Sequence, residues 1–101
     1  MRVALGEFAC FCVANRFGAD IGQGIQAVAR YYSRKLASQA DSGPRSRLPR
    51  RLEKPFVELD VPLDAEVVHR LKDEARTRSV DVQQILNHAV FVYFADLDRN
   101  F

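Results

Sequence analysis

The feature that most constrains the fold of this chain is a short alternating segment after Pro55. Apolar side chains stand at every second position, and polar residues or proline stand between them; the apolar positions are Val57, Leu59, Val61 and Leu63. A period of two predicts a β-strand with one buried face. Pro62 cannot donate a hydrogen bond to a neighbouring strand, so we expect the strand to end near it. A lone strand has unpaired backbone groups on both edges, and the fold must therefore supply it with a partner.

Two amphipathic helices are predicted after the strand. Asp64 is a suitable N-cap for the first helix, and Asp81 is one for the second. The first helix has an apolar stripe at Val67, Val68, Leu71 and Ala75, and it ends at Ser79 and Val80. The second has a longer stripe with steps of three and four residues, at Val82, Ile85, Leu86, Ala89, Val90, Tyr93, Phe94 and Leu97.

One strand and two short helices cannot bury all of their apolar faces alone. The simplest remedy is a twofold homodimer, in which two strands pair antiparallel and the helices interlock beneath them. We therefore predict a mainly α-helical fold that homodimerisation completes. Its dimer core is expected at Val57, Leu59, Val61, Leu71, Ala75, Leu86, Ala89, Val90 and Tyr93.

Residues 54–97 resemble the ribbon-helix-helix (Arc/CopG-like) superfamily. The resemblance rests on the strand, the cap Asp64, the Leu71 to Ala75 spacing, the turn before Asp81, and the helix with Leu86, Ala89 and Tyr93, within the run VELDVPLDAEVVHRLKDEARTRSVDVQQILNHAVFVYF. It implies one strand and two helices per chain, and a homodimer whose paired strands enter the major groove of DNA. It also implies a role as a small regulator or an antitoxin.

The resemblance further implies which residues contact DNA. The base-facing positions would be Glu58, Asp60 and Pro62, and the backbone at Asp81, Val82 and Gln83 would hold a phosphate. This sequence departs from the family here, because members that read DNA usually present Arg, Lys, Thr, Asn or Gln on that face. Carboxylates that are doubled in a dimer repel a polyanion. They also suit an ordinary solvent-facing strand, where charge opposes aggregation.

A basic segment before the strand offers another route to DNA. Residues 39–55, QADSGPRSRLPRRLEKP, hold three prolines, a glycine and two serines, which oppose regular structure. Their basic residues are Arg45, Arg47, Arg50, Arg51 and Lys54. Residues 1–55 carry ten Lys or Arg against four Asp or Glu, whereas residues 56–101 carry five against nine. The segment is either an arm that lies along phosphates or a solvated linker.

Residues 1–38 are interpreted as a helical segment. Leu5, Phe8, Ala9, Cys12 and Val13 suit one helical face, and Asp20 is a candidate cap for a second helix. A shift of 61 residues places Ala14, Asp20, Gln23, Tyr32 and Leu36 on identical residues of the C-terminal helices. Either a degenerate repeat or shared helical periodicity would account for these identities.

In that alignment the first copy has no strand, because the corresponding stretch would begin before Met1. We therefore expect these residues to dock as a helical pair and not to form a ribbon within the chain. The expected docking site is the second apolar face of the last helix, at Phe91 and Val92. The alternative is that this face binds another protein.

Residues able to carry chemistry are few. Cys10 and Cys12 are too close for the usual zinc knuckle, and His69 and His88 are far from them in sequence. No phosphate-binding loop or pair of catalytic carboxylates stands in a recognisable setting. We therefore expect no enzyme activity, no cofactor and no metal. Two cysteines make no disulfide framework, which favours a cytoplasmic setting, and no apolar run reaches the roughly 20 residues of a membrane helix.

The expected organisation is a helical segment (1–38), a basic linker (39–55) and a ribbon-helix-helix dimerisation module (56–101). Two function classes fit it. The first is a dimeric DNA-binding regulator assisted by the basic linker. The second is a non-enzymatic interaction module, antitoxin-like or an accessory scaffold, whose acidic ribbon binds a protein instead of DNA.

Overall fold

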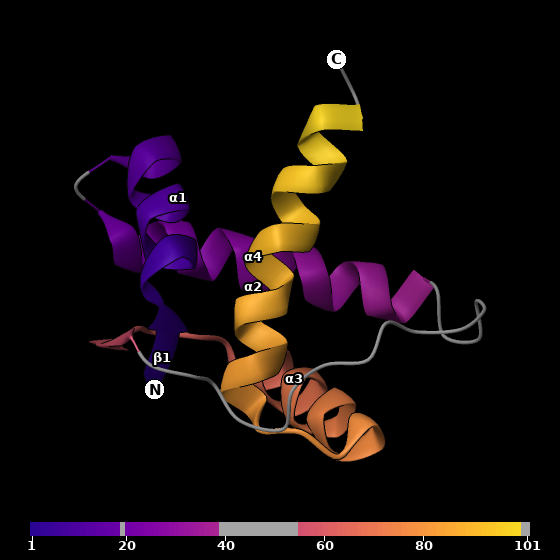
Figure 1. Ribbon diagram of the computed structural model, residues 1–101. Coiled ribbons are helices and arrows are strands. Elements are labelled where there is room, and N and C mark those ends of the chain that lie inside the picture. The colour runs from indigo at the N-terminus through magenta and orange to yellow at the C-terminus, as the bar shows by residue number, and fades with distance from the viewer. Residues whose placement is uncertain (19, 39–54, 100–101) are drawn as a thin grey trace.

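The structure is a computed structural model that describes residues 1–18, 20–38 and 55–99 of the chain. Two strands and four helices follow one another as two successive strand-helix-helix units (Figure 1). In chain order they are β1 (Arg2–Gly6), α1 (Glu7–Phe17), α2 (Ile21–Ser38), β2 (Phe56–Asp60), α3 (Ala65–Arg78) and α4 (Val82–Arg99).

The two strands form an antiparallel ribbon within one chain. Its register runs from Arg2 opposite Asp60 to Gly6 opposite Phe56. Beyond its last residues the ladder continues, because the Val61 N–H donates to the Met1 carbonyl and the Met1 ammonium donates to the Val61 carbonyl, each at 2.8 Å. The strand predicted after Pro55 thus finds its partner near the start of the same chain.

This pairing corrects our expectation that residues 1–38 have no strand and form no ribbon within the chain. Val3 and Leu5 alternate with Arg2 and Ala4 in the same period of two that marks the second strand. The alternation is short and runs straight into the apolar helix α1, so periodicity alone assigns Leu5 to a helical face. Since β2 is paired within the chain, it does not require a second chain as a partner.

The helices of the two halves match at the expected shift of 61 residues. α2 and α4 are both 18 residues long, and α1 and α3 end at Phe17 and Arg78. Each of these ends is followed by a residue of positive φ, Gly18 at 75° and Ser79 at 58°. The Gly18 N–H donates to the Ala14 carbonyl, as the Ser79 N–H does to the matching carbonyl 61 residues later. The left-handed residue is a common helix terminator that satisfies the last carbonyls.

The halves differ where the strand joins the helix. β1 passes directly into α1, whereas residues 61–64 separate β2 from α3. In addition, α1 has 11 residues and α3 has 14. Four linking residues and three helical residues are therefore missing from the first half, and its strand stands seven residues later than the shift of 61 predicts. This displacement is why the alignment places that strand before Met1.

A single core joins the halves. α2 crosses α4 near the middle of the molecule, α1 packs on α2 as α3 packs on α4, and α1 touches α4 as α2 touches α3 (Figure 1). Of the residues predicted for the dimer core, Val61, Leu71, Ala75, Leu86, Ala89 and Val90 are buried, and Val57, Leu59 and Tyr93 are half-buried. They pack against the N-terminal half of their own chain, where Val3, Leu5, Val13, Ile25, Val28, Ala29 and Tyr32 complete the core.

The N-terminal helices lie against α4, as expected, but they do not cover all of it. Tyr31 of α2 meets Tyr93 edge-on, with ring centroids 5.4 Å apart. Phe91 stays 40% exposed, and Phe8 is 67% exposed instead of lying on the buried face of a helix. The prediction for Phe8 is wrong because Leu5, its presumed neighbour on that face, belongs to β1. The two phenylalanine rings stack on each other at 6.0 Å.

Candidate functional site

The ribbon presents one buried and one outward face. Val3 and Leu5 are buried beneath it, and the residues between them point the other way. The outward positions are Arg2, Ala4 and Gly6 of β1 and Phe56, Glu58 and Asp60 of β2. Glu58 and Asp60 are exposed, as the sequence predicted. Pro62 is exposed as well, but it follows the end of β2 and so does not belong to the ribbon face.

Cations of the first strand accompany the carboxylates of the second. Arg2 Nη2 lies 3.2 Å from Glu58 Oε2, and the Met1 ammonium lies 3.8 Å from Asp60 Oδ1. Arg2, Glu58 and Asp60 are largely exposed, so these pairs add little to stability. Their main effect is on local charge. An intrachain ribbon carries Glu58 and Asp60 once, and its other strand supplies no carboxylate.

The outer edge of β1 is covered by two amide side chains of α4. Gln83 Oε1 accepts the Ala4 N–H at 2.7 Å, and Asn87 Oδ1 accepts the Gly6 N–H at 2.9 Å. Residues four apart lie on one helical face, so the first turns of α4 run along the strand edge. The sequence shows two amide side chains four residues apart, but their role can be recognised only once β1 is known to lie beside α4. The equivalent α2 positions, Gly22 and Gln26, make no such bond within the described ranges.

The predicted phosphate-holding turn is therefore anchored beside the ribbon. Asp81 is exposed and accepts the Gln84 N–H at its carbonyl, 3.0 Å away, and Val82 begins α4. Gln83 contributes its side chain to the strand edge, while its backbone belongs to the first turn, where amides have no intrahelical acceptor. The other predicted DNA contacts, Arg45, Arg47, Arg50, Arg51 and Lys54, lie outside the described residues.

The cysteines and histidines are dispersed. Cys10 is buried, which raises the pKa of its thiol, and Cys12 is half-buried; both are free. His69 is exposed and lies 3.3 Å from Asp73 on its own helix. No group of three or more His, Cys, Asp or Glu side chains that could hold a metal ion occurs in the part of the chain that the structure describes.

His88 lies in a partly buried polar cluster beneath α3. Burial lowers its pKa, and the Arg78 guanidinium lowers it further, against an opposing effect of Glu74. Arg78 Nε lies 3.0 Å from Glu74 Oε2, and both side chains are nearly buried. At a shift of 61 residues these two positions correspond to Phe17 and Val13, which are apolar. The cluster thus replaces an apolar contact of the first half by an ion pair.

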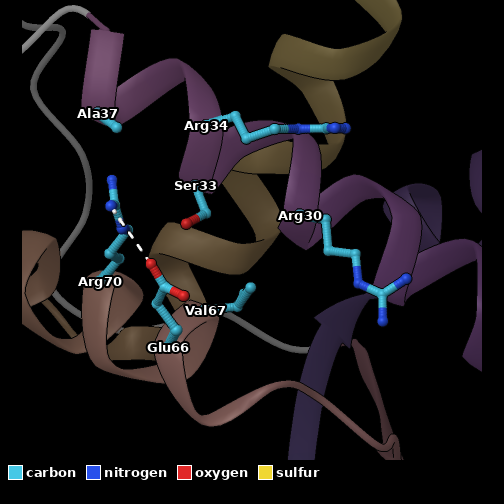
Figure 2. A pocket seen from close by; sticks show the side chains of 7 residues that line it. All are labelled: Arg30, Ser33, Arg34, Ala37, Glu66, Val67 and Arg70. Carbon is cyan, nitrogen blue, oxygen red and sulfur yellow. Dashed lines mark ion pairs between the residues drawn. The ribbon is translucent and has the colours of Figure 1, made fainter.

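A basic pocket opens between α2 and the beginning of α3 (Figure 2). Its volume is about 230 Å³. Arg30, Ser33, Arg34 and Ala37 of α2 line one wall, and Glu66, Val67 and Arg70 of α3 line the other. No sequence motif marks it, because its two walls are far apart in the chain and meet only in the folded protein.

Comparisons with known proteins do not add to this description: no family model matches the chain, and neither a curated protein nor a solved structure is detectably similar. Within residues 1–18, 20–38 and 55–99, no helix is long and apolar enough to cross a bilayer.

Proposed function

We propose that this protein is a non-enzymatic DNA-binding regulator of ribbon-helix-helix type, in which both strands of the ribbon come from one chain. The observation that carries the proposal is the intrachain ribbon with the start of α4 fixed along its edge by Gln83 and Asn87. A two-stranded ribbon fits the major groove of B-DNA. A helix N-terminus beside it supplies free amides and a positive dipole for a flanking phosphate.

The charge of the ribbon face opposes DNA binding less when both strands come from one chain than when they come from two copies of β2. A homodimeric ribbon would present two copies each of Glu58 and Asp60, whereas this one presents one of each beside Arg2. The Arg2 side chain is 71% exposed, so its guanidinium can leave Glu58 and bind a phosphate or a guanine edge instead. The basic residues at 45–54 would add further phosphate contacts as an arm.

A fluorescence anisotropy titration of labelled duplex at several salt concentrations tests the proposal. We expect the affinity to fall steeply with salt, and the slope of log K against log salt to decrease by about one per phosphate contact removed. Arg2→Ala and a combined Arg45, Arg47, Arg50 and Arg51→Ala variant should both weaken binding. Arg76→Ala is the matched control, since Arg76 is equally exposed and pairs only with Asp73 on its own helix among the described residues. Failure to bind any duplex at low salt would overturn the proposal.

A second candidate function is supported by a different surface. Phe8 and Phe11 of α1 are 67% and 66% exposed, and Phe91 of α4 is 40% exposed and stacked on Phe8. Exposed aromatic groups on adjoining helices are typical of a protein-binding surface. This surface favours the interaction-module alternative, in which the fold presents the aromatic face to a protein. The double variant Phe8→Ser, Phe11→Ser tests this alternative. Loss of a protein partner in the variant, with no duplex binding by either the parent protein or the variant, would support it.

A further inference from the structure

A nearly buried serine of α2, Ser33, lines the pocket between α2 and α3. Ser33 is only 5% exposed, and within the described residues its side chain has no hydrogen-bond partner. Figure 2 shows its oxygen directed toward the space that faces Glu66 and Arg70. The hydroxyl oxygen is therefore accessible from the pocket and can bond a group that enters it.

The charge around this hydroxyl is positive. Arg34 is exposed and has no acidic partner in the part of the chain that the structure describes. Arg70 Nη2 lies 3.6 Å from Glu66 Oε1, which is too long for a good hydrogen bond. Arg30 points away from Ser33 and Arg70 (Figure 2). It donates to the Asp64 carboxylate at 3.0 and 3.4 Å. Figure 2 shows the Arg34 side chain directed along α2, away from Ser33 and Arg70, so Arg70 is the nearer guanidinium and Arg34 reaches an incoming anion by turning toward the pocket.

The first turn of α3 also borders the pocket. Asp64 stands at the N-cap of α3, but its side chain makes no cap hydrogen bond with that helix. Its carboxylate is instead held by Arg30. Glu66 and Val67, which line the pocket, belong to this uncapped turn. The N-terminus of α3 therefore lies beside the pocket without a side-chain cap, and the Glu66 carboxylate in the same turn partly offsets its positive dipole.

We propose that this pocket binds a small phosphate monoester as its dianion. Arg70 is one cationic donor, the exposed Arg34 becomes the second when its side chain turns into the pocket, and the Ser33 hydroxyl donates to a third oxygen. Guanidinium groups bind phosphate through charge-assisted hydrogen bonds that exceed neutral ones in strength. A volume of about 230 Å³ accommodates the phosphate and a small organic group beside Val67. Arg70 exchanges its long contact with Glu66 for the ligand.

The site would connect the two halves of the chain. α2 belongs to the first strand-helix-helix unit and α3 to the second, so a bound dianion joins them by hydrogen bonds from both walls. The ligand should therefore raise the melting temperature as it saturates the site. This inference does not depend on DNA binding, and its test requires no nucleic acid.

Isothermal titration calorimetry and thermal melting with phenyl phosphate and inorganic phosphate test the site, with acetate and chloride at equal ionic strength as controls. We expect saturable binding of phenyl phosphate with a parallel rise in melting temperature. Arg34→Ala and Arg70→Ala should each weaken it about tenfold or more, because each removes a charged hydrogen bond. Arg76→Ala is the control, because Arg76 lies on α3, as Arg70 does, but outside the pocket. It should leave the affinity for phenyl phosphate unchanged.

The variants separate binding from folding. Arg34 is exposed, so Arg34→Ala should keep the circular dichroism spectrum and melting temperature of the unliganded protein. The Ser33→Ala variant should bind more weakly without unfolding. Absence of saturable phenyl phosphate binding, or an equal effect of chloride and acetate, would overturn the proposal. So would a loss of duplex affinity in Arg34→Ala without any phenyl phosphate binding by the parent protein, since the pocket would then hold a backbone phosphate.

Discussion

Gln83 accepts the backbone N–H of Ala4 at 2.7 Å across 79 residues of sequence. This bond joins the last helix of the chain to its first strand, and it satisfies a strand-edge donor that β2 does not reach. Asn87 repeats the contact at Gly6 one helical turn later. The start of α4, where a phosphate is proposed to bind, is thereby fixed relative to the ribbon.

Removal of the Gln83 amide should loosen this edge. Gln83→Ala leaves the part-buried Ala4 N–H without its acceptor, at a cost of about 1 to 3 kcal/mol in the free energy of unfolding. Urea denaturation measures the loss, and amide hydrogen exchange should show faster exchange at Ala4. Gln23→Ala in α2 is the control, because that side chain is exposed and should change stability by less than about 0.5 kcal/mol. Unchanged exchange at Ala4 would contradict the contact.

Two glycines of α2 should respond to alanine in opposite directions. A Cβ atom at Gly24 would lie 2.6 Å from Val13 Cγ1 and 2.8 Å from Phe17 Cδ2, because α1 and α2 approach closely there. The steric cost of this Cβ should exceed the roughly 1 kcal/mol that alanine gains in helix propensity. We therefore expect Gly24→Ala to lower the free energy of unfolding by about 1 to 3 kcal/mol.

At Gly22 the nearest atom to such a Cβ is Asp20 Oδ1 at 3.6 Å, an ordinary contact. Gly22→Ala should therefore stabilise the protein by up to about 1 kcal/mol. Denaturant titration of both variants measures the difference. Equal effects of the two substitutions would show that the α1–α2 approach is not close.

The free energy of unfolding should decrease as the pH falls through the titration of His88. Its folded pKa lies below the ordinary histidine value of 6.5, because of burial and then of Arg78. Below pH 6.5 the unfolded chain therefore binds more protons than the folded one, and stability is lost until the folded pKa is passed. Above pH 6.5 this group contributes no pH dependence.

Urea midpoints at pH 7.5 and 5.5 measure the effect. His88→Gln should flatten the dependence in this window, where most carboxylates stay ionised. His69→Gln should retain it, since His69 is exposed on the surface of α3 beside Asp73. A parent protein that is equally stable at both pH values would contradict this role of His88.

The C-terminal half of the fold could be predicted from sequence because its signals are local. β2 ends before Pro62, α3 follows Asp64, and α4 follows Asp81, as the alternation and the caps indicated. Local signals failed at residues 2–6, where five alternating residues pass into an apolar helix without a separating turn. A strand so short is specified by its partner, and each residue of β1 pairs with a residue of Phe56–Asp60 that is 50 or more positions away.

The candidate sites were accessible to sequence reasoning to different degrees. Glu58 and Asp60 follow from strand alternation alone, and both point outward. The pocket does not follow from any local pattern, because Arg34 and Arg70 come together only when α2 of the first half packs on α3 of the second. The same holds for Gln83, whose role depends on which strand lies beside its helix.

The central claim is that the ribbon closes within one chain, and a disulfide across it tests this most directly. Ala4 faces Glu58 in the register, and the Ala4 N–H points to Gln83, so the two form a non-hydrogen-bonded pair with closely spaced Cβ atoms. Ala4→Cys with Glu58→Cys, in a Cys10→Ala, Cys12→Ala background, brings two thiols within bridging distance.

After mild oxidation at low micromolar concentration, non-reducing electrophoresis and mass spectrometry of the variant give the answer. We predict a species of monomer mass, two hydrogens lighter than the reduced chain and without free thiols. The single variants Ala4→Cys and Glu58→Cys should not form this species. A covalent dimer in which the thiol at position 4 of one chain is bonded to the thiol at position 58 of another would contradict the claim, because the two strands of the ribbon would then come from different chains.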